Sequence, residues 1–219
     1  MNKIDELIKQ YCPNGVEYKT IKNIVNDCFW IMPSTPKYML EGIPYITSKN
    51  IKNGKISFEN IKYISQDDYN NISKNRPILP NDILISMIGT LGENAIVSKD
   101  DGDFYGQNMY LLRLNEDIIN IKYFYYFFNS SNIKEYLNGI KNNSGQGFLK
   151  TKHIESIELP VPPLPVQEEI VKILDSFTEL EKELEKELEK RKQQYNYYRN
   201  QLLDFGKSAK NGENLRERE

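Results

Sequence analysis

The sequence predicts an α+β protein, in which a mainly β body with short helices is followed by one long helix. Two patterns lead to this prediction: short apolar segments separated by turn residues fill the first part of the chain, and a heptad pattern free of Gly and Pro follows Pro165. The proline-rich run 159–165 between them cannot be helical. We therefore expect a body at 1–160, a long coiled-coil helix at 161–206 and a disordered polar tail at 207–219.

Short elements follow one another along the body. A first helix is predicted by apolar residues at helical spacing from Ile4 to Tyr11, and it ends at the turn residues 12–15. Residues 16–21 alternate as in a strand. Turn residues such as those at 53–54 and 101–103 separate the further predicted strands, which are 43–47, 56–58, 61–64, 83–88, 95–97 and 109–114.

Helices return after Leu114. The aromatic-rich segment 121–128 follows Asn120, which is a suitable N-cap, and a second short helix at 133–137 is expected to end at Gly139. A basic loop at 141–147 and a strand around 154–159 complete the body.

The long helix carries an apolar seam. Positions four and three residues apart are apolar except for Glu181 and Arg191, a repeat of 3.5 residues that predicts a second helix lying alongside. If the helix were instead a solvated charged rod, the aromatic residues of this seam would be left in water. The apolar seam residues are Ile170, Leu174, Phe177, Leu184, Leu188, Tyr195, Tyr198, Leu202 and Phe205.

Composition restricts the class of protein. A net charge of -2 argues against a protein that coats nucleic acid indiscriminately, although a local basic surface remains compatible with it. No apolar run is as long as a membrane span and the N-terminus does not resemble a signal peptide, so we expect a cytoplasmic protein. Cys12 and Cys28 are isolated and are expected to be reduced thiols.

The residue types needed for most catalytic sites are missing. His153 is the single histidine, and neither a metal-binding cluster nor a phosphate-binding glycine loop occurs. Asp82 and Glu93 resemble the acidic pair of a metal-dependent nuclease, but Ala95 stands where that chemistry needs a lysine. We therefore expect no catalytic residue, no metal ligand and no bound cofactor in this chain.

Two basic loops rich in amide side chains, and a shorter basic segment, are candidates for DNA contact. Lysines can contact phosphates, and Asn and Gln can pair with base edges; the alternative is that these segments are ordinary solvated turns. Strand aromatics such as Tyr45 and Tyr105 could also touch bases but are more often core residues. The candidate residues are Lys49, Asn50, Lys52, Asn53, Lys55, Lys74, Arg76, Lys141, Asn142, Asn143, Ser144, Gln146, Lys150 and Lys152.

Four segments together resemble the specificity subunits of Type I restriction-modification systems. The most specific is 157–171, which reads Ile-Glu-Leu-Pro-Val-Pro-Pro-Leu-Pro-Val-Gln-Glu-Glu-Ile-Val and is similar to the family's junction between recognition domain and long helix. The others are Gly42–Lys55, Pro80–Thr90 and Ser144–Gln146. Together, the similarity covers about residues 16–205.

The resemblance implies a subunit that reads double-stranded DNA and has no catalysis of its own. It would direct adenine methylation by methyltransferase subunits, which hold S-adenosylmethionine, and cleavage by a restriction subunit. Typical members carry two recognition domains and two helices that pair antiparallel, whereas this chain has one of each. That departure predicts a half-subunit that pairs with a second copy of itself to read a bipartite site.

Two other classes remain open on the sequence alone. One is a protein-protein adaptor that uses the helix and never binds DNA, which the neutral charge would suit. The other is a stand-alone nuclease, which the missing residues disfavour.

Overall fold

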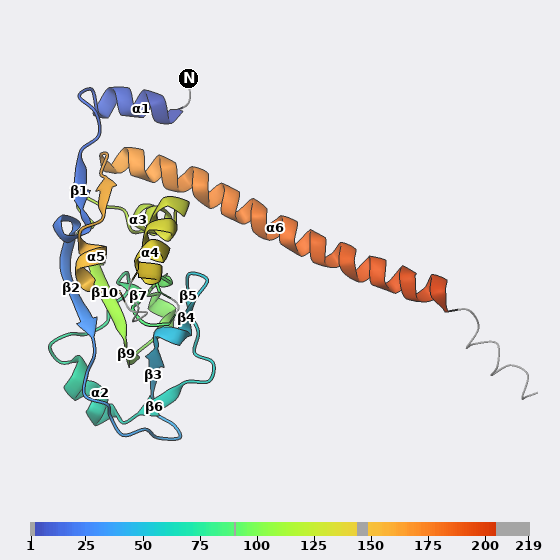
Figure 1. Cartoon of the computed structure of the whole chain (residues 1–219), viewed down its shortest axis with the longest axis horizontal. Coiled ribbons are helices and arrows are strands. Elements are labelled where there is room, and N and C mark those ends of the chain that lie inside the picture. Colours follow the sequence, from blue (N-terminus) through green and yellow to red (C-terminus); the bar gives the residue numbers. More distant parts are fainter. Residues whose placement is uncertain (1–2, 90, 144–148, 205–219) are drawn as a thin grey trace, which may run out of the picture. The chain divides into compact units, whose positions relative to one another are not determined.

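The computed structural model describes residues 3–89, 91–143 and 149–204, with backbone alone at 141–143. The chain divides into two compact units, Met1–Val171 and Lys172–Glu219. The fold is α+β, as predicted (Figure 1). Its α-helices are α1 (Lys3–Tyr11), α2 (Gln66–Ser73), α3 (Ile121–Phe128), α4 (Ser131–Asn143), α5 (Thr151–Glu155) and α6 (Leu164–Leu203).

Four small sheets are formed by eleven described strands. The strands are β1 (Tyr18–Thr20), β2 (Val25–Ile31), β3 (Ile43–Thr47), β4 (Ile51–Lys52), β5 (Lys55–Ile56), β6 (Lys62–Ile64), β7 (Ile83–Ser86), β8 (Asn94–Ile96), β9 (Tyr105–Gln107), β10 (Met109–Leu114) and β11 (Glu158–Pro160).

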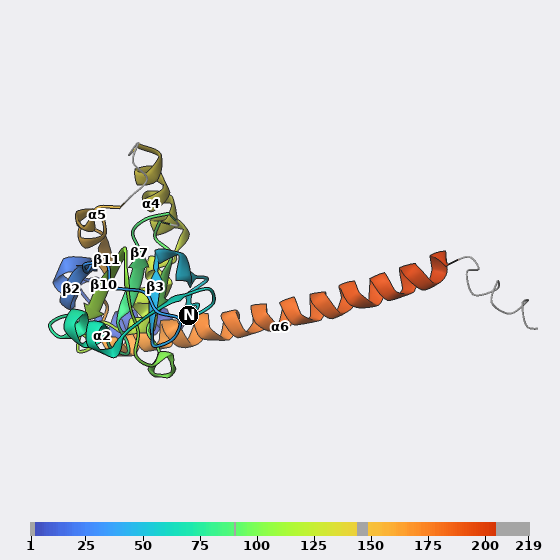
Figure 2. The ribbon, with the colours of Figure 1, turned by 90° about the horizontal axis from the view of Figure 1, so that it is seen from below.

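The largest sheet has the order β2-β10-β7-β8 and is antiparallel, and Figure 2 shows β2, β10 and β7 in a row. Its central strand β10 is apolar on both faces. Tyr110 and Leu112 belong to one hydrophobic cluster, whereas Met109 and Leu111 belong to another. Because side chains alternate across a strand, this sheet separates two cores.

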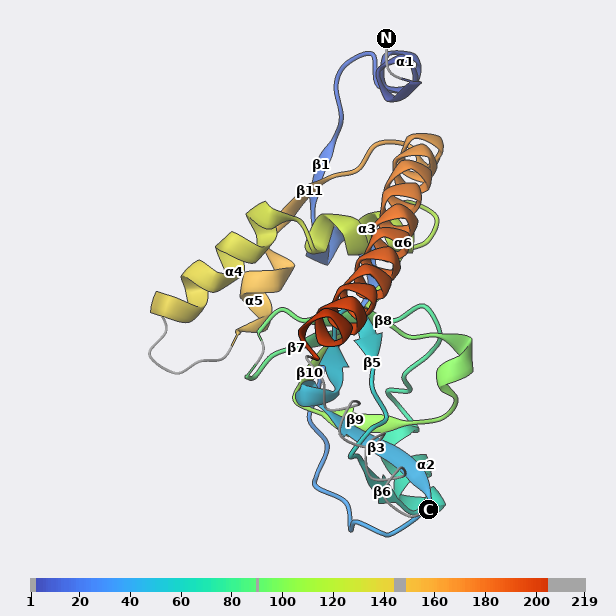
Figure 3. The same ribbon diagram turned by 90° about the vertical axis from the view of Figure 1, so that its right-hand side faces the viewer.

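Each core is closed by different elements, as Figure 3 shows: α3, α4 and α5 gather on one side of β7 and β10, and β3, β6 and β9 lie on the other. The helical side buries Phe124 and Phe128 of α3. The opposite side buries Tyr45 and Ile46 of β3, which pairs antiparallel with β6 and parallel with β9.

The proline junction forms part of the body. Strand β11 pairs antiparallel with β1, with Tyr18 opposite Pro160, and the chain then turns through Pro162 and Pro163 into α6. The first turns of α6 bury Val166, Gln167 and Val171. The compact body therefore reaches Val171, beyond the proline run at which the sequence had suggested a boundary.

Gln167 is a buried polar residue with three hydrogen bonds. Its side-chain oxygen accepts from the backbone N–H of Asn120 at 2.8 Å, and its Nε2 donates to the carbonyls of Ile118 at 2.9 Å and Pro162 at 2.7 Å. A buried amide is tolerated when its donors and acceptor are paired. These bonds fasten the start of α6 to the segment that leads into α3.

Several predicted elements are confirmed and others are wrong. The first helix, the strands 43–47 and 109–114 and the helix 121–128 lie as predicted, and the Asn120 side chain accepts from Tyr123 N–H as an N-cap. The predicted strand 16–21 is shorter, because residues 21–24 form a 3-10 helix. The second helix does not end at Gly139 but continues to Asn143, since helical glycines are tolerated when neighbours pack.

Three strands, β2, β4 and β9, and two helices, α2 and α5, were not predicted, and α5 occupies residues 154–155 of the predicted strand 154–159. β2 contains polar residues between its apolar ones, and β9 contains a glycine, so neither shows a clear strand pattern. α2 lies in a polar segment, where the Ser65 side chain accepts from Asp68 N–H as a cap. The predicted helix cap at Gly206 and the tail 207–219 lie outside the described residues.

The long helix α6 has 40 residues and begins at Leu164, so residues 161–163 lie outside it, whereas the last two residues of the proline-rich run 159–165, which was expected to be entirely non-helical, belong to its first turn. From Lys172 onward its surface is mostly polar, with ion pairs between Lys182 and Glu179 at 3.3 Å and between Arg191 and Glu187 at 2.8 Å. Within the part of the chain that the structure describes, no helix has an apolar stretch that could span a lipid bilayer.

Candidate nucleic-acid interface

The first basic loop forms a small, internally bonded hairpin. Thr47 caps the 3-10 turn 48–50, and the Asn50 side-chain oxygen accepts from the Thr47 backbone N–H at 3.0 Å. The Asn50 Nδ2 donates to the carbonyls of Ser57 at 3.0 Å and Glu59 at 3.3 Å. Because this amide already has partners on both of its ends, the geometry gives Asn50 a structural place in the loop and does not favour it as a base reader.

The tip of this hairpin is a two-residue turn between β4 and β5. Asn53 and Gly54 both have positive φ angles, 51° and 75°, as a type I′ turn requires. The Asn53 N–H donates to a Glu93 carboxylate oxygen at 3.2 Å, and Gly54 lies so close to the Tyr125 hydroxyl that a Cβ there would clash with it. The turn is thus contacted by Glu93, which precedes β8, and by Tyr125 of α3.

The charges at the hairpin are mixed. The side chains of Lys49, Lys52 and Lys55 are exposed, whereas the Glu93 carboxylate lies beside the turn. Burial, followed by the negative charge of Glu93, raises the pKa of the Tyr125 hydroxyl, so it stays protonated at neutral pH. The hairpin therefore offers three cations on a supported turn and one acidic neighbour.

Lys74 and Arg76 follow α2, which lies apart from the β4–β5 hairpin in Figures 1 and 3. Both side chains are exposed. The Arg76 guanidinium lies over the Phe29 ring at 5.1 Å, and the Arg76 carbonyl accepts from the Tyr105 hydroxyl at 3.0 Å. The ring orients the guanidinium while leaving it accessible.

The second basic loop is only partly described. Lys141, Asn142 and Asn143 form the end of α4 as backbone, and Ser144 and Gln146 lie outside the described residues. Lys150 precedes α5 and Lys152 lies within it, both exposed. Figure 3 shows α5 separated from the β4–β5 hairpin, so the described candidates fall into three groups rather than one cluster.

The predicted aromatic core residues are confirmed as core. Tyr45 and Tyr105 are almost fully buried, and burial raises the pKa of both hydroxyls. They cannot stack on bases without unfolding of the sheet β6-β3-β9.

The acidic residues considered for nuclease chemistry have structural partners. Both Asp82 oxygens accept from Arg113, at 2.8 and 2.7 Å, and one also accepts from Leu79 N–H at 2.7 Å. The hydrogen bond to Asp82 raises the pKa of Arg113 further. Among the described residues, no group of three or more His, Cys, Asp or Glu is arranged to hold a metal ion.

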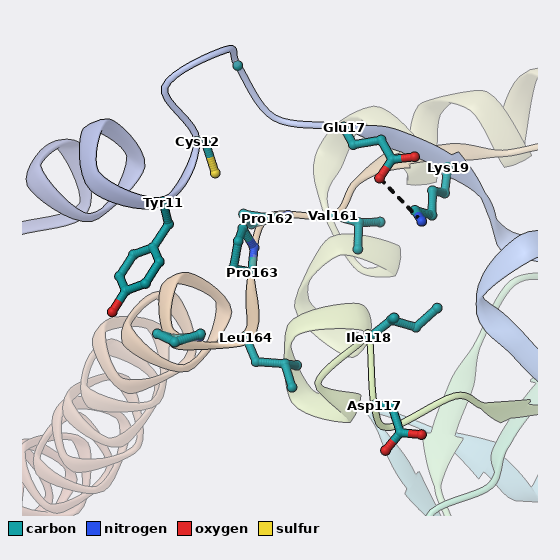
Figure 4. Close-up of a pocket in the computed structure, with 12 residues that line it drawn as sticks. Tyr11, Cys12, Glu17, Lys19, Asp117, Ile118, Val161, Pro162, Pro163 and Leu164 are labelled. Carbon is teal, nitrogen blue, oxygen red and sulfur yellow. Dashed lines mark ion pairs between the residues drawn. The ribbon is translucent and has the colours of Figure 1, made fainter.

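A cleft of about 570 Å³ lies at the proline junction (Figure 4). Tyr11 and Cys12 line one side, and Ile118 lies across from them near Leu164. Its charged lining includes the Glu17–Lys19 ion pair, with 3.3 Å between the charged atoms. Asp117 lines the cleft as well, beside proline and aliphatic side chains.

The seam residues of α6 fall into two groups. Ile170 is partly buried against the helical core of the body, and Leu174 is half-buried. The others are exposed by 52% to 73%: Phe177, Leu184, Leu188, Tyr195, Tyr198 and Leu202. Large apolar side chains at heptad spacing and so exposed are typical of an interaction surface. Phe205 lies outside the described residues.

Sequence reasoning missed Gln167 and the Asp82–Arg113 pair as supports of the site. Gln167 could have been noticed because it is a lone amide between Val166 and Val171, which both face the core. Arg113 interrupts an otherwise apolar strand, which is a sign that a buried partner is needed.

Comparison with known proteins gives a consistent result. Residues 13–190 match the family model described as Type I restriction modification DNA specificity domain. The Type I restriction enzyme EcoprrI specificity subunit of Escherichia coli is 31% identical over 220 residues, covering 94% of this chain and 49% of that protein. The MjaIX specificity subunit of Methanocaldococcus jannaschii is 28% identical over 203 residues, covering 88% and 45%.

Solved structures share the fold. A chain from a study of complex assembly and conformational transition of the type I R-M system matches with a TM-score of 0.66 and 17% identity, covering 92% of this chain and 49% of that one. The HsdS subunit from Thermoanaerobacter tengcongensis matches with a TM-score of 0.54 and 16% identity, covering 81% and 42%. This chain thus spans about half, or less, of the length of the relatives it matches.

Proposed function

Because this chain belongs to the family of Type I restriction-modification DNA specificity domains, we propose that it acts as a non-catalytic specificity subunit with one DNA-reading body. In this proposal its body reads one half of a bipartite site on double-stranded DNA. Its long helix pairs with a second copy that reads the other half. The observation that carries the proposal is the exposed apolar seam of α6.

The seam argues for a second helix. Six large apolar side chains of the seam would remain in water if the helix stayed alone. Covering each of them with a partner helix removes apolar surface from water and so stabilises the pair. Helix pairs of this kind form through a and d positions, which the four-three spacing supplies. Two identical chains related by a two-fold axis present two identical bodies to the DNA. The bound site should therefore consist of two identical, inverted half-sites.

The basic groups supply the expected DNA contacts. Exposed Lys49, Lys52, Lys55, Lys74, Lys150 and Lys152, together with Arg76, would contact phosphates and set the register on the duplex. Of the amide residues, Asn53 at the hairpin tip and the group Asn142, Asn143 and Gln146 remain our choices for base edges. Lys141 and Ser144 belong to the same segment as Asn142, Asn143 and Gln146 and would contact the DNA with them.

The chemistry would belong to partners. Methyltransferase subunits would bind S-adenosylmethionine and methylate adenine at the site that this chain selects, and a restriction subunit would cleave DNA. This chain would hold the partners in place in the cytoplasm of its host. Its role is positioning, since the family is one of specificity domains.

The first experiment tests the seam. Phe177→Asp with Leu184→Asp should convert a dimer into a monomer, because each chain would bring two charges into the seam. Light scattering measures the change, and an exposed control, Glu183→Gln with Glu189→Gln, should remain a dimer. A wild-type chain that stays monomeric with and without methyltransferase subunits would refute the pairing.

The second experiment tests DNA reading. Sequencing that detects methylated adenine in the source genome identifies the site, and fluorescence titrations then compare duplexes with two half-sites, one half-site or none, at stated salt. We expect the two-half-site duplex to bind most tightly, and the Phe177→Asp, Leu184→Asp chain to lose that preference. Equal binding to all three duplexes would refute reading, and no binding would favour the adaptor.

Helix length gives a third test. Deleting residues 183–189 removes one heptad and keeps the seam continuous with Glu181 and Arg191 in place, while shortening each helix by about 10 Å at 1.5 Å per residue. Along B-DNA this is roughly three base pairs at 3.4 Å each. The preferred spacing of the half-sites should shorten accordingly.

A further inference from the structure

The seam of α6 is symmetric about its own centre, and this symmetry specifies a pairing. Its interrupting residues are Glu181 and Arg191, which lie five residues on either side of Lys186. Each seam position from Ile170 to Leu202 has a counterpart at the same distance on the other side of Lys186. When two copies run antiparallel and cross at Lys186, each of these seam residues therefore meets its counterpart.

We propose that the antiparallel pair of long helices takes a single register when two copies of this chain form it, in which Glu181 of each copy meets Arg191 of the other across the seam. This inference rests on the proposed function, which calls for a second copy, and it adds the register and the contacts. The layers that follow are Leu184 with Leu188, Phe177 with Tyr195, and Leu174 with Tyr198, each occurring twice.

The heptad positions agree with this geometry. With Leu184 at d and Leu188 at a, Glu181 falls at a and Arg191 at d, so each layer joins an a position to a d position. Such mixed layers are produced by antiparallel helices, because reversing one helix exchanges the order of its two core positions. Two leucines meet in the central apolar pair, and the outer apolar pairs bring an aromatic ring against a second ring or an aliphatic side chain, so apolar contacts fill the seam on both sides of the charges.

Charge selects the orientation. In a parallel pair at equal register, Glu181 would face Glu181 of the other copy and Arg191 would face Arg191, so both polar layers would repel. In the antiparallel register they become two Glu–Arg layers. Arg191 also holds Glu187 of its own helix at 2.8 Å, and its planar group has donors left for a second carboxylate.

Charge also selects the register. If one antiparallel helix slides by a heptad in either direction, Glu181 faces Tyr198 or Leu184, and Arg191 faces Leu188 or Leu174. A charge covered by an apolar side chain loses hydration without gaining a partner. Sliding therefore removes two ion pairs and buries four charges.

One pair of acidic residues opposes the register weakly. Glu185 and Glu187 flank the crossing point, so each approaches its own copy near the two-fold axis. Both side chains are exposed, and Glu187 is paired with Arg191. Repulsion between exposed charges is small in water, and it is smaller than the penalty of uncovering the seam pairs.

Charge reversal in the full chain tests the inference. Glu181→Arg and Arg191→Glu should each raise the dimer dissociation constant about tenfold or more, because each creates two like-charge layers. The double reversal restores opposite charges in the antiparallel register and should return the constant to within about threefold of the original. In a parallel pair the double reversal would still repel.

Sedimentation equilibrium at one low salt concentration measures the constants, and circular dichroism checks that helix content is kept. Glu183→Arg is the matched control: it makes the same charge change off the seam and should shift the constant by less than about threefold. Glu181→Leu with Arg191→Leu should tighten the dimer, since apolar residues replace a desolvated pair.

The outcomes separate the two proposals. A dimer that resists both single reversals, or a double reversal as weak as the single ones, overturns the antiparallel register while leaving the dimer intact. A wild-type chain that is monomeric at high concentration overturns the pairing and the proposed function together.

Discussion

The side-chain oxygen of Gln167 accepts a hydrogen bond from the backbone N–H of Asn120 at 2.8 Å, joining the first turns of α6 to the residue that caps α3. Both Gln167 amide hydrogens are used as well, by the carbonyls of Ile118 and Pro162. The proline junction is therefore defined by a polar clamp in addition to its prolines.

Replacing Gln167 by Leu should lower the free energy of unfolding by about 3 kcal/mol, because three backbone groups in the junction lose their partner. Urea unfolding followed by circular dichroism measures the change. Glu168→Leu, one residue on and exposed, should change the free energy by less than about 0.5 kcal/mol. Equal effects of the two substitutions would contradict the clamp.

Gly54→Ala should destabilise the protein by about 2 kcal/mol or more, because the new Cβ meets the Tyr125 hydroxyl and φ is positive. Gly15→Ala is the control, since its φ is also positive but no atom lies within 4 Å of the added Cβ. Thermal unfolding should show the smaller loss for the control. Adding Tyr125→Phe to Gly54→Ala should recover part of the stability, and a cycle without coupling would argue against the contact.

Arg113→Met should cost about 3 kcal/mol or more, because it leaves the buried Asp82 carboxylate without its charged partner. The double variant Arg113→Met with Asp82→Leu removes both charges and should be more stable than Arg113→Met alone. Denaturant midpoints compare the three chains. If the double variant were the least stable, the pair would have a role beyond neutralising charge.

The free energy of unfolding should fall above about pH 10, where the tyrosines of the unfolded chain ionise. Burial raises the pKa of Tyr123 to about 12, and its hydroxyl donates to the Pro160 carbonyl. Between these values the unfolded chain releases the proton and the folded chain keeps it, so the folded state binds more protons and loses stability as pH rises. Tyr123→Phe should make this decline shallower, by at most about 1.4 kcal/mol per pH unit.

Urea unfolding at several pH values from 8 to 11.5 gives the slope. Tyr45, Tyr105 and Tyr110 also have raised pKa values, so the decline should persist in the variant with a smaller gradient. Parallel declines in the two chains would show that Tyr123 does not contribute.

Lys52→Gln and Lys55→Gln should each weaken binding to all DNA sequences alike. Removing one lysine–phosphate interaction should reduce the slope of log affinity against log salt by about 0.9. Titrations at several salt concentrations measure this slope, and the melting temperature should not change because both side chains are exposed. An unchanged slope would place the DNA elsewhere than at this hairpin.

The fold class and the long helix could be predicted because their signals are periodic and local. The heptad pattern continues from Ile170 to Phe205, and the run at 109–114 is apolar apart from Arg113. β2 and β9 could not be predicted from such signals, because their pairing with β10 and β3 comes from residues far away in the chain. These two segments are strands because distant strands pair with them, not because of a local sequence pattern.

The candidate interface was predicted less well than the fold. Net charge and loop composition located the exposed lysines, but they did not show that Asn50 is used up by the carbonyls of Ser57 and Glu59. Sequence likewise gave no sign that Glu93 would lie beside Asn53. Such contacts depend on how the hairpin packs, which composition does not record.

The self-contained hairpin has an evolutionary consequence. Its frame is held by Thr47, Asn50 and Gly54, whereas Lys52 and Lys55 pair with each other through their backbones and leave their side chains exposed. Mutation can therefore exchange the side chains at those two positions without disturbing folding, so that the strength of the proposed phosphate contacts can change in evolution while the scaffold stays under purifying selection.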